Sequence, residues 1–406
     1  MKKLAIIFVL ALGLRIFLIG VWYQTGQGDR LSADGYCYRT MAENLIQGKG
    51  FQLEEKPTAR RPPVYPLFVS FFLKYNLFPL GIQIAHALIG ALSCLLLFAL
   101  AKEIFDEKVG LLASGILAID YLSVRQTLSI MPETLFVFFL LGTFYFLMLA
   151  YREKKMKGVI LAGLLAGLSL LTKEVLLFYF PFVVLWVFLW KNSWKNRFLM
   201  AGIFSVSLAI VIAPWVVRNS LLYGRPALLT VGGGGKTFYL ANNPQATGGI
   251  TGGDWVLGVD TAMPQDVPSS FRNSPTPDIE EDYFFKEAVN FIWKNPWSFV
   301  KLAGKKIVNM WRPYQTDSPV PARWASAVSY APVLILGLLG LFRSANRWRE
   351  FFPIFTLIGY IFFLHALLIA HIRYRYPVMP FFMIFASFAL LQFFRKQKVS
   401  HAYSVN

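Results

Sequence analysis

Charged side chains occur at the ends of apolar segments along this 406-residue chain, in places where ionisable groups are costly. At membrane depth each such group costs about 2.5–3.5 kcal/mol on insertion scales, so its presence usually indicates a functional site. The candidates come from segments far apart in the sequence: Asp34, Arg60, Arg61, Arg125, Glu133, Lys173, Glu174, Arg218, His371, Arg373 and Arg375. A carboxylate can act as a general base, and arginine binds phosphate through paired hydrogen bonds. The residue types therefore predict a base working beside an anion-binding site.

Asp34 and Glu133 are the acids best suited to that chemistry, although each also has a structural explanation. Asp34 stands at the expected start of a helix, where Asp is a favoured N-cap. Glu133 follows Pro132, and a proline followed by an acid is ordinary helix-start chemistry. Spacing alone does not choose between the explanations. Two acids on one face of the membrane, beside several cations, favour the catalytic one.

The cations Arg218 and His371–Tyr376 stand at the outer ends of apolar segments. Their structural explanation is snorkelling into an aromatic belt at the membrane surface. The excess of basic residues on the cytoplasmic side opposes that explanation for arginines on the outer side. Because arginine is permanently charged and matches phosphate geometry, a lipid phosphate is the natural anion for these residues.

Membrane helices must position these groups. The chain is 56% hydrophobic and only 15% charged, against about 25% charged in soluble domains, which excludes a soluble globule and a disordered chain. Crossing about 30 Å of hydrocarbon takes around 20 apolar residues. Ten segments qualify, the third and fifth being short: Leu4–Val21, Gly81–Leu100, Val109–Leu122, Glu133–Ala150, Gly158–Leu171, Val175–Trp190, Phe198–Val217, Ala327–Phe342, Phe351–Ala370 and Pro377–Phe394. We predict an all-α polytopic membrane protein with about ten transmembrane helices.

Alternate loops are basic, which places both termini in the cytoplasm and the candidate site outside it. The expected parts are a transmembrane module with a catalytic first outer loop, an outer region with interfacial helices, further transmembrane helices and a cytoplasmic tail: residues 1–218 with the loop 23–80, 219–326, 327–394 and 395–406. The formal charge of +18 then anchors the chain in the membrane, so no nucleic-acid partner is expected. The run Val231-Gly-Gly-Gly-Gly-Lys-Thr lacks the first glycine of a P-loop and predicts no ATP site.

A set of short motifs resembles the bacterial arm of the GT-C membrane glycosyltransferases, which includes the protein O-mannosyltransferases and the aminoarabinose transferase of lipid A. The motifs follow the family's order along nearly the whole chain: Asp34-Gly-Tyr…Ala42-Glu-Asn-Leu-Ile-Gln-Gly-Lys-Gly-Phe51, Arg61-Pro-Pro-Val-Tyr-Pro-Leu-Phe, Glu133-Thr-Leu-Phe, Gly163–Lys173, Ala213-Pro-Trp-Val-Val-Arg-Asn, Asn242-Asn-Pro…Thr247-Gly-Gly and Arg373-Tyr-Arg-Tyr-Pro. Each is weak alone, and the ordered set is fairly specific.

The resemblance implies a GT-C-like fold and an inverting enzyme that moves a sugar from a polyprenyl phosphate to an extracytoplasmic lipid, glycan or protein. Asp34 would deprotonate the acceptor, and Glu133 matches a second acidic position where the family often has Asp. The donor phosphate would be held by Arg218, Arg373, Arg375 and Lys173. The substrate cavity would be lined by Arg60, Arg61, Tyr65, Arg125, Glu174, Tyr374 and His371. Some relatives bind a divalent cation; this sequence has no obvious His–Glu pair, and a metal stays open.

Two other functions remain possible from the sequence. One is a non-catalytic transporter or flippase of lipid-linked sugars, in which the arginines bind cargo; pseudo-symmetric halves and broken helices, which would indicate it, are not evident. The other is a ligase that moves a whole glycan from a polyprenyl diphosphate. The resemblance implies the inner (plasma) membrane of a prokaryote, with membrane lipids around the chain. The sequence does not specify the sugar, the acceptor or the length of the lipid.

Overall fold

The computed structural model describes residues 2–53, 55–249, 277–316 and 318–403. Within them the regular secondary structure is helical apart from one short hairpin, in which β1 (Gln52–Leu53) pairs antiparallel with β2 (Lys56–Pro57). The predicted all-α class is confirmed, with a helix in each segment where a span was expected. Those helices are α1 (Lys2–Gln24), α4 (Leu80–Ile104), α5 (Glu107–Ile119), α7 (Glu133–Glu153), α8 (Met156–Thr172), α9 (Phe180–Phe188), α10 (Trp194–Tyr223), α15 (Val320–Arg343), α16 (Trp348–Leu367) and α17 (Met379–Tyr403).

Seven of the described helical segments are long and apolar enough to cross a membrane: Lys2–Gln24, Leu80–Ile104, Glu133–Glu153, Trp194–Tyr223, Val320–Arg343, Ala345–Leu367 and Ile372–Phe394. The remaining three expected spans are shorter, with 13 residues in α5, 17 in α8 and 9 in α9. The total of ten spans therefore stays a prediction.

Two of the expected spans are interrupted by residues that start a new helix. The segment expected over Val109–Leu122 ends at Ile119, because the Asp120 carboxylate caps α6 (Tyr121–Gln126) by accepting from the Ser123 N–H. The segment expected over Val175–Trp190 divides into the 3-10 turn η1 (Glu174–Leu176) and α9. A proline in the first turn of α9 accounts for that division, since it has no N–H to continue a preceding helix.

One buried arginine inside α1 is used to hold helices together. Arg15 is 1% exposed and donates to the carbonyls of Ala118 at 3.1 Å and Leu117 at 3.5 Å, where α5 ends. A cation satisfies the carbonyls that a helix leaves unpaired at its C-terminus. Gly90 of α4 makes room for this side chain, since a Cβ there would lie 2.7 Å from Arg15 Nε.

Helices α8 and α10 approach each other closely through two glycines of the predicted Gly163–Lys173 motif. A Cβ on Gly163 would lie 2.7 Å from the Phe204 carbonyl oxygen, and one on Gly167 would lie 2.6 Å from Val211 Cβ. Small residues four apart let two backbones come together, which is the usual way for apolar helices to associate in lipid. The motif therefore fixes the helix that ends just before Lys173.

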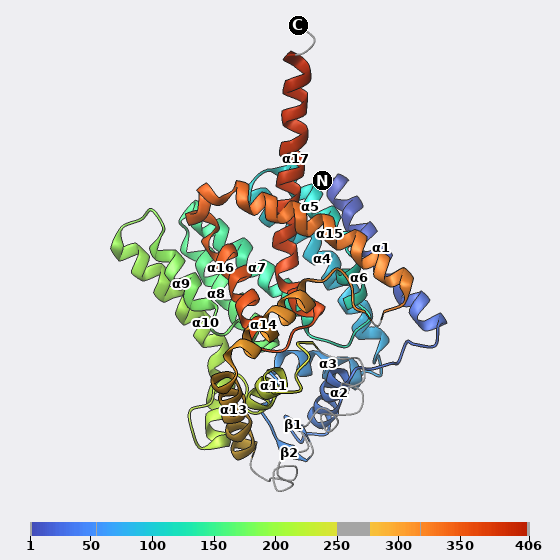
Figure 1. The fold of residues 1–406 in the computed structure, drawn as a ribbon, viewed down its shortest axis with the longest axis vertical. Coiled ribbons are helices and arrows are strands. Elements are labelled where there is room, and N and C mark those ends of the chain that lie inside the picture. The colour runs from blue at the N-terminus through green and yellow to red at the C-terminus, as the bar shows by residue number, and fades with distance from the viewer. Residues whose placement is uncertain (1, 54, 250–276, 317, 404–406) are drawn as a thin grey trace.

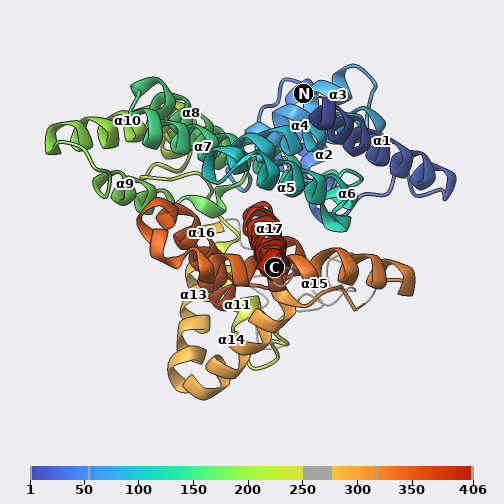
Figure 2. The ribbon, with the colours of Figure 1, turned by 90° about the horizontal axis from the view of Figure 1, so that it is seen from above.

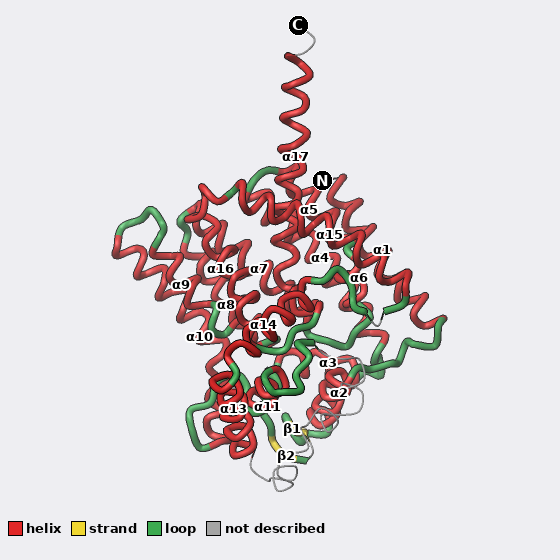
Figure 3. Tube along the Cα trace, viewed as in Figure 1, coloured by secondary structure: helices red, strands yellow, loops and turns green. Residues whose placement is uncertain are grey.

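The short elements gather at one end of the molecule. Helices α2 (Ala33–Ile46), α3 (Val64–Lys74), α11 (Gly234–Ala241), α13 (Pro277–Lys294) and the hairpin lie away from the start of α1 and the end of α17 (Figure 1). Most of the long loops are at the same end (Figure 3). Seen from above, α10 and α1 lie on opposite sides of the molecule (Figure 2). The helix α14 (Pro296–Trp311) and the turn η3 (Ile372–Val378) connect the long helices with this end.

Candidate active site

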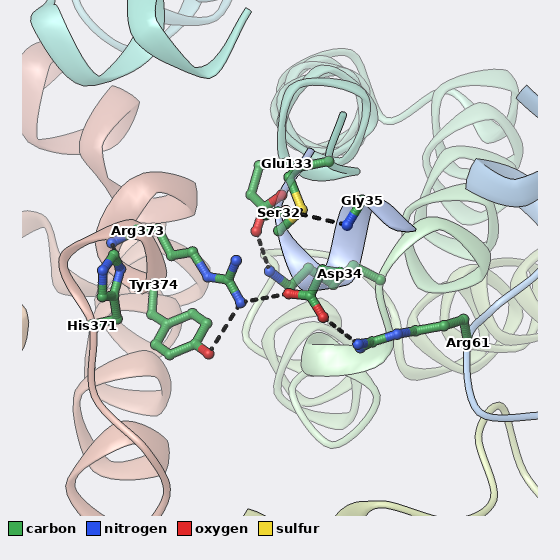
Figure 4. Close-up of polar contacts among 10 residues, drawn as sticks. Ser32, Asp34, Gly35, Arg61, Glu133, His371, Arg373 and Tyr374 are labelled. Atoms are coloured by element: carbon green, nitrogen blue, oxygen red, sulfur yellow. Dashed lines mark hydrogen bonds and ion pairs between the residues drawn. The ribbon is translucent and has the colours of Figure 1, made fainter. Parts of the chain in front are cut away.

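Asp34 is the second residue of α2 but does not cap that helix. Ser32 is the N-cap, and its hydroxyl accepts from the Gly35 N–H at 3.1 Å. The Asp34 carboxylate is instead buried, at 6% exposure, between two guanidinium groups. Arg61 Nη2 donates to Oδ1, and Arg373 Nη2 donates to Oδ2 at 2.9 Å (Figure 4). The N-cap role that the sequence allowed for Asp34 is therefore taken by Ser32.

The two guanidinium groups also decide the charge of Asp34. Burial alone would raise the pKa of this carboxyl, but the nearby charges of Arg61 and Arg373 outweigh burial and hold the pKa below its usual value. Asp34 is thus ionised at neutral pH. An ionised carboxylate can accept a proton, although one held by two cations is a weak base.

Glu133 is the first residue of α7 and is 1% exposed. Its Oε1 accepts from Lys173 Nζ at 2.8 Å, whereas its Oε2 is buried and has no hydrogen-bond partner. Glu133 stands at a helix N-terminus, where a negative charge is favourable. For Glu133, unlike Asp34, the structural explanation therefore applies. The Oε2 atom of Glu133 is left as a buried acceptor without a hydrogen-bond partner, next to the Lys173 ion pair.

The Tyr374 ring lies near a cation of each acid. The Lys173 Nζ atom is 5.6 Å from the centre of the Tyr374 ring, and the Arg373 guanidinium carbon is 5.1 Å from it. Cations at such distances are attracted to the face of an aromatic ring. His371 orients the turn, because its Nδ1 accepts from the Arg373 backbone N–H at 3.1 Å. His365 stacks on Tyr374 with ring centres 4.5 Å apart.

The predicted convergence is thus observed for part of the set. Asp34, Glu133, Arg61, Lys173 and Arg373 come from α2, α7, the approach to α3, the end of α8 and η3, and they form one charged cluster (Figure 4). Two acids and three cations leave one formal positive charge in a largely buried place.

Arg218 and Arg375, expected to hold the donor phosphate, lie outside this cluster. Arg218 donates to the carbonyl of Thr58 at 2.8 Å, and its guanidinium carbon lies 4.7 Å from the centre of the Trp215 ring. Arg375 is 1% exposed and donates to the carbonyls of Met310, at 2.9 Å, and Arg312. Both guanidinium groups bind backbone, and neither contacts the Asp34 or Glu133 carboxylate in the described structure. Their contacts are those of residues that hold segments in place.

The other predicted cavity residues are spread around the cluster. Tyr65 is buried beneath it, edge-on to Tyr38 at 4.8 Å, with its hydroxyl 3.4 Å from His86 Nε2. Arg60 is exposed, and its Nε lies 3.8 Å from the position that a Cβ on Gly233 would take. Arg125 is exposed and lines a separate small cavity with Arg30 and Ser32.

Glu174, next to Lys173, is half-buried. Its carboxylate forms neither a hydrogen bond nor an ion pair with any described side chain, yet its charge acts on Arg61. It is therefore close to the cluster without being a member of it.

Tyr38 and His86 were not predicted to belong to the site, although Tyr38 contacts Arg61 of the cluster and His86 contacts Tyr65 next to it. The Arg61 guanidinium carbon lies 5.6 Å from the centre of the Tyr38 ring. His86 of α4 contacts Tyr65 of α3, with 3.4 Å between its Nε2 and the tyrosine hydroxyl. Tyr38 lies four residues after Asp34 in α2, so helical spacing was a usable signal for it. Nothing in the sequence pairs His86 with Tyr65.

A divalent metal, which the resemblance left open, does not fit the residues that are described. No group of three or more His, Cys, Asp or Glu side chains in that part of the chain could hold a metal ion. The two central carboxylates are also occupied by Arg and Lys side chains rather than turned toward each other.

Comparisons with known proteins agree with the motifs. Residues 60–217 match the family model described as dolichyl-phosphate-mannose-protein mannosyltransferase, a stretch that includes Arg61, Glu133 and Lys173. No curated protein sequence matches the chain significantly.

Solved structures share the fold at low sequence identity. The Archaeoglobus fulgidus oligosaccharyltransferase in the apo form has 14% identity and a TM-score of 0.58, over 99% of this chain and 51% of that one. The same values hold for oligosaccharyltransferase AglB of that organism in complex with an inhibitory peptide and a dolichol-phosphate. This chain therefore spans about half the length of those proteins. ArnT from Cupriavidus metallidurans bound to undecaprenyl phosphate has 13% identity and a TM-score of 0.42, over 93% of this chain and 76% of that one.

At such identities a likeness shows the fold alone. The fold and the family-model match nevertheless agree with each other and with the order of the motifs. Both findings agree with the resemblance predicted from the sequence: residues 60–217 match the mannosyltransferase family model, and the chain shares the fold of the Archaeoglobus fulgidus oligosaccharyltransferase.

Proposed function

We propose that this protein is an inverting glycosyltransferase that moves a sugar from a polyprenyl phosphate to an acceptor outside the cytoplasm. The observation that supports it best is the Asp34 carboxylate, which is buried and bound on both oxygens by guanidinium groups. A second acid, Glu133, is paired with Lys173 beside it. A lipid-linked donor is further supported by the dolichol-phosphate complex of AglB, a protein of the same fold.

In this proposal Asp34 takes the proton of the acceptor hydroxyl. The acceptor oxygen then attacks the anomeric carbon from the face opposite the phosphate, and the bond from that carbon to the phosphate oxygen breaks. The electron pair leaves with the polyprenyl phosphate, and the configuration of the sugar carbon inverts. Arg373, Arg61 and Lys173 would stabilise the negative charge on the leaving oxygens, which is usually the largest contribution to such catalysis.

The same guanidinium groups serve both the base and the leaving phosphate. Because Arg373 and Arg61 bind Asp34 in the present structure, a donor phosphate would compete with Asp34 for them. A carboxylate that loses one of two cations while staying buried becomes a stronger base. Donor binding would in this way prepare Asp34 for its proton transfer.

We also propose that the end of the molecule carrying α2, α11 and α13 faces outward from an inner (plasma) membrane, with both termini in the cytoplasm. Helices α13 and α14 would lie along the outer membrane surface. The Trp293 and Trp297 side chains are 81% and 78% exposed, and exposed tryptophans with flanking lysines are typical of helices at the membrane interface. The acceptor would reach the cluster from this side.

A transfer assay with lipid analysis tests the proposal. The purified protein is extracted for bound lipid, which is identified by mass spectrometry, and is then incubated with a labelled polyprenyl-phosphate sugar and cell-envelope acceptors. We expect a polyprenyl monophosphate in the extract and label in the acceptor fraction. Label transferred only from a polyprenyl diphosphate would support a glycan ligase instead. Movement of labelled lipid across a vesicle membrane without transfer would support a transporter.

A further inference from the structure

Lys306 of α14 is a fully buried lysine, at 0% exposure, and no carboxylate in the described structure pairs with it. Lysine is almost never fully buried unless it is paired with an acid. Burial lowers the pKa of Lys306 to about 8. The side chain lies on the inner face of α14 with Leu302 and Met310, one helical turn away on either side. Burying an unpaired lysine is costly, so the hydrogen bonds of its ammonium group should indicate what it does.

The Lys306 ammonium joins three segments. It donates to Asn242 Oδ1 at 2.8 Å and to the Leu367 carbonyl at 2.9 Å. Asn242, itself fully buried, donates to the same Leu367 carbonyl at 2.9 Å and to the Phe238 carbonyl at 2.9 Å. Leu367 is the last residue of α16, so its carbonyl belongs to the negative end of a helix. A lysine and an amide thus fix the point where α16 ends.

The other end of the following turn is also fixed to α14. Arg375 donates to the Met310 carbonyl at 2.9 Å and to the Arg312 carbonyl, where α14 ends. Its guanidinium carbon lies 3.5 Å from the centre of the Tyr330 ring. The segment between Leu367 and Arg375 is therefore attached to α14 on both sides. Arg373, which pairs with Asp34, lies in that segment.

We propose that Lys306 is a positioning residue for Arg373. Its ammonium and Arg375 together hold residues 367–375 against α14, so that the Arg373 guanidinium reaches Asp34 and, on the function proposed above, the donor phosphate. This brace, formed by Lys306, Asn242, Leu367 and Arg375, also connects the outer helices α11 and α14 to the site. A displacement of the outer helices would move Arg373.

Hydrogen exchange tests the brace without depending on activity. Amide exchange is measured in the full-length protein for wild type, Lys306→Met and Lys301→Met, the last removing an exposed lysine of the same helix. We expect Lys306→Met to speed exchange of residues 367–376 by about tenfold or more, and Lys301→Met to leave it unchanged. Unchanged exchange in Lys306→Met would overturn the proposal. If that variant does not accumulate, Asn242→Ala tests the same brace.

Transfer kinetics then test the route through Arg373. We expect Lys306→Met to lower kcat/KM for the donor by about 10–100-fold, as small misplacements of a binding group do. In an Arg373→Gln background the same change should have little further effect, since the residue that it positions is gone. An equal loss in both backgrounds would contradict the proposal. If wild type transfers no sugar, the proposed function fails, whereas the exchange result still decides whether Lys306 holds this segment.

Discussion

Arg373 donates to the Asp34 carboxylate at 2.9 Å although 339 positions separate the two residues in the chain. One belongs to the turn η3 just before the last long helix, and the other to α2, near the start of the chain. Their contact closes the charged cluster, and the remaining oxygen of Asp34 is bound by Arg61. This contact therefore brings residues from the two ends of the chain together in one site.

Arg61→Gln should move the acid limb of the transfer rate to higher pH. In the folded protein the pKa of Asp34 lies below its usual value. The ion pairs of Asp34 therefore stabilise the fold above about pH 4, and this stabilisation is lost as the pH falls further and the carboxylate is protonated. Without Arg61, burial has more weight and the pKa rises. The neighbouring variant Arg60→Gln is the control, since Arg60 is exposed and does not pair with Asp34. Identical pH profiles for both variants would refute the assignment.

Lys173→Met should destabilise the protein more than Glu133→Gln does. Glu133 is 1% exposed at its side chain, against 20% for Lys173, so removal of the lysine leaves a buried charge and removal of the acid leaves one that reaches water. Breaking a buried pair costs about 3–5 kcal/mol, and less where a partner is exposed. Thermal unfolding in detergent measures the difference, and the double variant should recover part of the loss. Equal losses in the two single variants would be inconsistent with this pair.

Gly163→Ala should lower the unfolding temperature, whereas Gly202→Ala should raise it slightly. A Cβ at Gly163 of α8 would lie 2.7 Å from a backbone oxygen of α10, and one at Gly202 of α10 would meet nothing within 4 Å. Alanine in a helix is otherwise favourable by about 0.5–1 kcal/mol over glycine. The two unfolding midpoints should therefore move apart, and a stabilised Gly163→Ala protein would show that the helices are not in close contact there.

Much of the fold and the centre of the site were predictable from the sequence. Apolar runs predicted the long helices, because a lipid environment leaves little choice of structure for them. The two acids and Arg373 were predicted to meet, since each stood at the outer end of its segment. The breaks at Asp120 and before α9 were not predicted, because a cap or a proline within an apolar run has little effect on hydropathy.

The sequence could not distinguish Arg373 from Arg218 and Arg375. All three follow apolar segments, but Arg218 and Arg375 bind backbone carbonyls. Because every residue has a carbonyl, no pattern of side chains in the sequence indicates such a contact. Lys306 was not predicted to have a role, because α13 and α14 contain several other lysines. Its spacing of four from Leu302 and Met310 placed it on the buried face of a helix and was a usable signal.

Donor binding and sugar transfer by Asp34→Asn test the central claim most directly. The variant keeps the size of the side chain but cannot accept a proton as a base, and it releases Arg61 and Arg373 for the phosphate. We expect transfer to fall by about 10²–10⁴-fold, while the labelled polyprenyl-phosphate donor binds as tightly as to wild type or more tightly. Asp29→Asn, an exposed acid of the same loop, serves as the control and should keep full activity. A protein with Asp34→Asn that still transfers sugar at the wild-type rate, or that loses donor binding and transfer equally, would contradict the account.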